Sequence, residues 1–203
     1  LVGGPGWTPD AAADLEAFAL RWQLPVGNAF RFQDTFDNHH PCYAGDVGIA
    51  INPLLAQRIH QADVLLVVGP RLGEMTTNGY TLLNLPVPHQ KLVHVHCASD
   101  ELNRVYQTPY AFNAVMPHVA KQLAALHAPS QLPWADWCAS AHADYLANIL
   151  PQSVVIDNPA PTGKVVAMAQ HVATLQRLLP ANATLTNGAG NFASWMHRYF
   201  KYH

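Results

Sequence analysis

A run of five aliphatic residues, Val64-Leu65-Leu66-Val67-Val68, continues directly into Gly69 and constrains the fold more than any other stretch. A strand that is apolar on both faces lies inside a sheet that helices cover on both sides. Upstream, Asn52-Pro53 is typical of a helix start, because Asn is a good N-cap and Pro suits the first helical position. Helix, buried strand and glycine turn predict the centre of an α/β sheet of nucleotide-binding type, although a plain core strand with a structural turn would look the same.

Further strands and helices alternate around this stretch, which favours a parallel sheet. The first helix has Thr8 as its N-cap and Pro9 in its first turn. We expect strands at 1–2, 24–30, 43–48, 91–96 and 110–115, and helices at 9–22, 53–61, 100–106 and 116–126. A helix at 134–150, a proline-bearing linker at 151–163, a helix at 164–179 and a strand at 183–186 follow. The predicted organisation is a central domain at 1–127, a helix and linker at 128–163, and the beginning of another domain at 164–203.

The composition bounds the partners of this chain. Only 12% of its 203 residues are charged, against about 25% in ordinary soluble domains, so we expect its surface to pack against other domains or copies. The net charge of -2 provides no basic field for nucleic acid. Three cysteines are too few for a disulfide framework and favour a reducing, cytoplasmic setting. No run of 18 apolar residues predicts a membrane span.

Several residues invite a chemical interpretation, and each also has a plainer one. The Gly3-Gly4 turn before a helix start could receive a phosphate on backbone N–H groups, or it could be a tight structural turn. Arg71 could pair with a phosphate or form a surface salt bridge. His94 and His96 share one face of a strand, where they would line a cleft or contribute to a metal site. We assign no metal ligands, because no pair has the usual ligand spacing.

Taken together, these segments resemble the central domain of thiamine-diphosphate-dependent enzymes of the acetolactate synthase group. The stretch Ala62 to Arg71 is similar to the family pattern A-D-[LV]-[LIV]-[LIV]-x-[LIV]-G-x-R. Gly190-Asn191, with Phe192 where the family has His, resembles the opening of the diphosphate-binding domain. The resemblance covers almost the whole chain.

The resemblance implies a Rossmann-like, six-stranded parallel sheet with helices on both faces and a C-terminal helical extension. It also implies a longer protein, in which a pyrimidine-binding domain precedes this chain and the rest of a diphosphate-binding domain follows it. That protein would use thiamine diphosphate and Mg²⁺ to decarboxylate a 2-keto acid or to ligate the resulting carbanion, and would be a homo-oligomer. The activating glutamate and the magnesium motif would lie outside this chain, so the chain itself would be inert and carries no catalytic residue.

Some relatives hold FAD or ADP in this domain. The positions that match a nucleotide site are Gly3, Gly4, Asn28, Gly45, Asp46, Gly69, Arg71, His94, His96 and Asn113, and Gly190 and Asn191 match a diphosphate site. Two departures weigh against FAD: histidines replace acidic residues at the end of the 91–96 strand, and Leu72-Gly73 begins a segment that lacks the family's F-D-D-R. The alternatives are a self-contained flavin or nucleotide module of electron-transfer flavoprotein type, and a metal-binding protein that uses the histidines.

Overall fold

Strand β3 (Val64–Val68) lies inside a parallel sheet, as its aliphatic sequence predicts. The computed structural model describes residues 1–150 and 167–203. In it, β3 pairs with β4 (Lys91–His96), and β4 pairs with the edge strand β5 (Tyr110–Asn113). A second pair, β1 (Val26–Ala29) and β2 (Tyr43–Val47), is also parallel. These two groups account for the regular strands of the described residues.

Leu1 and Val2 connect the two groups of strands. The Val2 N–H donates to the Gly27 carbonyl at 2.9 Å, and on the other side the Val68 N–H donates to the Leu1 carbonyl at 2.9 Å. The order across the molecule is therefore β2, β1, Val2, β3, β4, β5. The parallel α/β fold is confirmed, but the expectation of six strands is wrong for the described residues, where Val2 forms only isolated bridges. Gly3 turns the chain away at φ +145°, so the first segment is too short for a regular strand.

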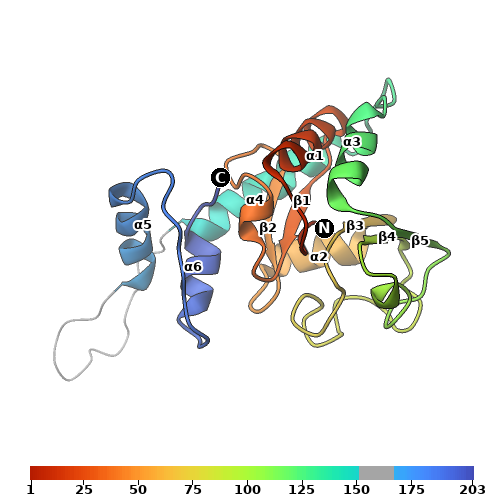
Figure 1. The fold of residues 1–203 in the computed structure, drawn as a ribbon. Helices are drawn as coiled ribbons and strands as arrows, with labels where there is room; N and C mark the ends of the chain where they lie inside the picture. Colours follow the sequence, from red (N-terminus) through yellow and green to blue (C-terminus); the bar gives the residue numbers. More distant parts are fainter. Residues whose placement is uncertain (151–166) are drawn as a thin grey trace.

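Helices α1 (Pro9–Trp22) and α3 (Met116–Ala125) pack side by side on one face of the sheet (Figure 1). The N-cap of α1 is Thr8, whose hydroxyl accepts a hydrogen bond from the Ala11 N–H at 3.2 Å. Its apolar face is buried through Leu15 and Phe18, as the helical spacing predicts.

Helix α2 (Pro53–Gln61) lies on the other face, where Leu55 and Ile59 are buried. The N-cap is Asn52, which accepts from the Leu54 N–H at 3.0 Å. Residues 70–90 form a long irregular segment that adds buried leucines to the same core. Helix α4 (Ala135–Ile149) packs against β2 and α2.

The remaining described residues form α5 (Met168–Leu178) and α6 (Ala193–Tyr199), which pack together beyond β2 (Figure 1). The chain end returns to the sheet, since the Asn38 N–H donates to the Tyr202 carbonyl at 2.8 Å. The predicted linker at 151–163, and residues 164–166 of the predicted helix at 164–179, lie outside the described residues. None of the described helices combines the length and the apolar character that crossing a membrane requires.

Two local predictions are wrong. Where a helix was expected at 100–106, the chain forms only a 3-10 turn, η2 (Ser99–Glu101), because Asn103 adopts φ +58° and interrupts the helix. Another 3-10 turn, η1 (Gln33–Thr35), follows β1. Residues 183–186 form no strand, and none of the described strands pairs with them.

Candidate functional site

The carboxyl ends of the parallel strands meet at one edge of the sheet, and the Gly3-Gly4 and Gly69 turns lie there beside each other. The chain reverses its direction of progress through the sheet between Val2 and β3. Such a switch point is where open α/β sheets bind ligands. The structure therefore brings Gly3, Gly4 and Gly69 together at the place where a nucleotide would be expected.

These two turns touch through their backbones. A Cβ added to Gly4, which has φ +76°, would lie 2.0 Å from the Gly69 carbonyl oxygen. A Cβ added to Gly69, which has φ +92°, would lie 2.2 Å from the Gly3 carbonyl oxygen. The Trp7 indole N–H donates to that same Gly3 oxygen at 2.7 Å. Backbone atoms and an indole thus occupy the switch point.

Helix α1 begins at this turn, but its first turn is poorly suited to a phosphate. Pro9 has no N–H, and the Thr8 hydroxyl already accepts from the Ala11 N–H. The Asp10 carboxylate in the same turn would repel an anion. These groups reduce the anion affinity that a helix N-terminus normally has.

Asn28 lies next to the switch point in β1, where Val2 bridges to it. Its side chain is fully buried, and its Nδ2 donates to the Phe32 carbonyl at 2.7 Å. Its Oδ1 is buried without a hydrogen-bond partner. This acceptor is the one feature of the edge that a bound donor would complete, although it is enclosed by protein.

Arg71 and His94 lie on the other side of the switch point and are occupied by protein groups. The His94 Nε2–H donates to the Pro70 carbonyl at 3.1 Å, and burial lowers the pKa of His94, which keeps the imidazole neutral. The Arg71 side chain is 66% exposed and lies 3.8 Å from Glu101, which also pairs with Arg104 at 2.9 Å. The cavity between these side chains is about 10 Å³, room for roughly one water molecule.

His96 and Asn113 are adjacent on β4 and β5. The Asn113 Nδ2 donates to the His96 carbonyl at 2.9 Å, and the His96 Nδ1 accepts from the Ala98 N–H at 3.0 Å. His94 and His96 stand 6.2 Å apart between ring centroids. No group of three or more His, Cys, Asp or Glu side chains in the described ranges is arranged to hold a metal ion.

Gly45 and Asp46 lie on β2, two strands from the switch point. Asp46 is in register with Asn28, but it also lies near α6, where the Arg198 charge acts on it. Burial raises the pKa of Asp46 to about 7, and Arg198 opposes that rise. Gly190 and Asn191 form an exposed turn before α6, and the Ala193 N–H donates to the Gly190 carbonyl at 3.1 Å.

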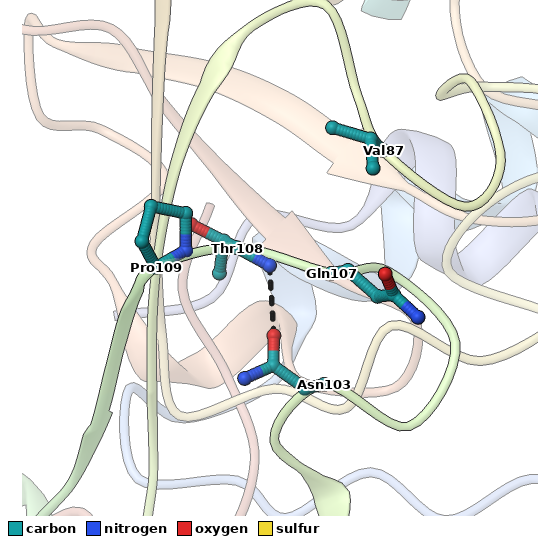
Figure 2. A pocket seen from close by; sticks show the side chains of 5 residues that line it. All are labelled: Val87, Asn103, Gln107, Thr108 and Pro109. Atoms are coloured by element: carbon teal, nitrogen blue, oxygen red, sulfur yellow. Dashed lines mark hydrogen bonds between the residues drawn. The ribbon is translucent and has the colours of Figure 1, made fainter.

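A larger hollow lies elsewhere, at the amino ends of β4 and β5 (Figure 2). It is an open depression of about 470 Å³ lined by Val87, Asn103, Gln107, Thr108 and Pro109. The Asn103 Oδ1 accepts from the Thr108 N–H at 2.7 Å, which holds the loop that forms one side (Figure 2). None of the sequence-predicted residues lines it, and it faces away from the switch point.

The arrangement does not fit a flavin or an adenine nucleotide. The switch point is filled by backbone contact, the nearest cavity holds about one water, and the one nearby arginine pairs with Glu101. Sequence reasoning found the residues at the edge, because glycine turns after strands are visible in sequence. It did not find the mutual contact of the two turns, which depends on how the strands are ordered.

Comparisons with known proteins bear on the rest of the assignment. Residues 1–123 match the family model described as thiamine pyrophosphate enzyme, central domain. A sulfoacetaldehyde acetyltransferase of Alcaligenes xylosoxydans xylosoxydans is 24% identical over 223 residues, covering 100% of this chain and 37% of the relative. The enzyme of the same name from Castellaniella defragrans is 33% identical over 105 residues, which is 52% of this chain and 18% of the relative. That from Rhodobacter capsulatus is 35% identical over 68 residues, 34% of this chain and 12% of the relative.

Proposed function

Because the chain belongs to the thiamine pyrophosphate enzyme central-domain family, we propose that it is the middle part of a longer thiamine-diphosphate-dependent enzyme. The observation that carries this proposal is the match over residues 1–123, which coincides with the parallel sheet and its helices. The chain spans 37% of the length of the relative that it aligns with from end to end. A role in which further domains supply the cofactor site is consistent with that proportion.

The reaction that we propose for the longer protein is cleavage of a bond beside a carbonyl group, with transfer or release of the acyl unit. Thiamine diphosphate, when bound, supplies a thiazolium carbon that stabilises the carbanion left by such a cleavage. The substrates to be considered are a 2-keto acid, as the acetolactate synthase resemblance suggests, and sulfoacetaldehyde, as the names of the relatives suggest. Mg²⁺, a homo-oligomeric state and a cytoplasmic location are part of the same proposal.

Within that enzyme, the role that we propose for this chain is architectural. The switch point is closed by the contact of Gly4 with Gly69, and the sheet carries no assembled catalytic group among the described residues. Gly190 and Asn191 would contribute to diphosphate binding only together with residues outside this chain. The isolated chain should therefore be catalytically inert. Nothing in the fold or the comparisons favours the electron-transfer flavoprotein alternative.

The first test is the coding sequence of the source gene on both sides of this chain. We expect a domain with an activating glutamate before Leu1 and a magnesium-binding motif after His203. A gene that encodes neither would refute the proposal.

The second test is activity. The full-length product, supplied with thiamine diphosphate and Mg²⁺, should consume pyruvate or sulfoacetaldehyde, and the 203-residue chain under the same conditions should consume neither. Turnover by the short chain would contradict its architectural role, while a full-length protein that consumes neither substrate would refute the reaction class.

The third test separates architecture from nucleotide binding. Addition of FAD or ADP to the chain should leave its melting temperature unchanged, because the switch point is filled. A saturable rise in melting temperature that is lost in Arg71→Ala would show that a nucleotide site exists after all.

A further inference from the structure

Two cysteines from distant parts of the sequence lie in one buried cluster. Cys42 immediately precedes β2, and Cys138 is in the first turn of α4. Their residues are only 3% and 4% exposed, and both belong to the apolar cluster that α4 forms with β2 and α1. Tyr43 and Tyr145, whose ring centroids are 4.7 Å apart, pack in the same cluster.

The surroundings of Cys42 favour its thiolate. The Cys138 side chain hydrogen-bonds to it, the His40 side chain adds a second hydrogen bond, and the charge of His142 acts in the same direction. Although burial opposes them, these contacts lower the pKa of Cys42 to about 5. The neighbouring Cys42 and burial raise the pKa of Cys138, which therefore stays a thiol. A thiolate beside a thiol is the arrangement of a reactive cysteine and its resolving partner.

The two histidines are held in place by the backbone. The Cys42 N–H donates to the His40 Nδ1 at 3.1 Å, and the His40 ring packs edge-on against Phe36 at 4.9 Å between centroids. The His142 Nδ1–H donates to the Tyr43 carbonyl at 2.8 Å. Both rings are thus fixed near Cys42 by contacts that do not involve its sulfur.

We propose that Cys42 and Cys138 are an oxidant-sensitive pair that closes to a disulfide when the protein meets a peroxide. The Cys42 thiolate attacks hydrogen peroxide, the O–O bond breaks, and sulfenic acid and hydroxide form. The Cys138 sulfur then attacks the Cys42 sulfur and its proton leaves with the hydroxyl group as water. In total two thiols are oxidised, one peroxide is reduced, and two waters form. The new bond ties β2, inside the family match, to α4, which lies beyond residue 123.

Cys97 provides an internal control. It is exposed and follows β4, remote from the cluster. Peroxide can oxidise its sulfur, but the pair does not include it. The proposal therefore predicts one specific disulfide from three free thiols.

The test uses the whole chain carrying Cys97→Ser, reduced and then treated with hydrogen peroxide in the folded state. We expect the count of titratable thiols after denaturation to fall from two to none, with a mass loss of two hydrogens and full recovery after dithiothreitol. Peptide mapping should show the segment around Cys42 joined to the segment around Cys138. In Cys138→Ser, dimedone should trap a sulfenic acid at Cys42, and in Cys42→Ser the Cys138 thiol should persist.

Three outcomes would overturn the proposal. Both thiols could remain titratable at a peroxide dose that oxidises Cys97 completely in the unmodified sequence. The disulfide could be intermolecular, as a dimer on a non-reducing gel would show. The two cysteines could instead be oxidised individually, with added oxygen mass and no cross-linked peptide. Peptide mapping of the unsubstituted chain decides among these even where a serine variant fails to fold.

Discussion

The buried carboxyl group of Asp46 should make the folded chain less stable as the pH rises through neutrality. Burial between β2 and α6 raises its pKa from 3.8 to about 7, so the folded chain keeps a proton that the unfolded chain releases. Between these two values the folded state binds more protons than the unfolded state. The free energy of unfolding therefore falls as the pH increases from about 4 to about 7, and levels off above that.

The size of the effect follows from the two pKa values. A change from 3.8 to about 7 corresponds to about 4 kcal/mol at 1.36 kcal/mol per pKa unit. This is an upper limit, because movement of α6 or penetration of water would raise the effective dielectric constant around the carboxylate. Arg198 offers limited compensation, since its guanidinium donates to the Asn148 carbonyl at 3.0 and 2.8 Å.

Asp46→Asn removes the titration while keeping the shape of the side chain. We expect the variant to match the original chain near pH 4 and to exceed it by up to about 4 kcal/mol at pH 8. Urea unfolding curves at intervals of pH provide the measurement, and Asp63→Asn, at a carboxylate just before β3, is the control that should leave the pH dependence in place. An unchanged pH slope in Asp46→Asn, or a variant less stable than the original at pH 8, would refute this reasoning.

Other substitutions test the packing, each by urea unfolding. Gly69→Ala should cost at least about 3 kcal/mol or prevent folding, because φ +92° and a carbonyl at 2.2 Å both exclude a side chain; Gly6→Ala, at φ +90° with open space around it, should cost about 1 kcal/mol, and equal losses would argue against the backbone contact. Arg58→Ala should cost about 1–3 kcal/mol, because its Nε donates at 2.9 Å to a partly buried carboxylate of α4. Arg104→Ala, in an exposed pair, should change stability by less than about 1 kcal/mol, and a larger loss there would contradict this ranking. Thr8→Ala should cost about 1 kcal/mol, and no loss would show that the cap hydrogen bond contributes nothing.

The parts of the fold that the sequence predicts correctly are those set by local chemistry. The aliphatic run of β3 and the Asn52 and Thr8 caps with their following prolines appear as expected. The expected helix after Ser99 failed because Asn103 takes a left-handed conformation that no local pattern announces.

The candidate site shows the same division. Glycine turns mark the ends of strands in the sequence, so the residues at the carboxyl edge could be named in advance. Whether those turns leave an opening depends on the order of strands, and here Gly4 and Gly69 meet. The Cys42 and Cys138 cluster could not be inferred at all, because only the packing of α4 on β2 brings the two residues together.

The bridging position of Leu1 and Val2 has a consequence for how this chain folds. Each group of strands is joined by crossovers short enough to form early, whereas the Leu1 nitrogen reaches a carbonyl 65 positions away at Leu66. Within the described residues, this two-residue segment joins the two groups of strands. Its pairing should therefore be a late event in folding, and its loss would let the two groups unfold as separate units. The cooperativity of the domain rests on its shortest strand segment and not on its most hydrophobic one.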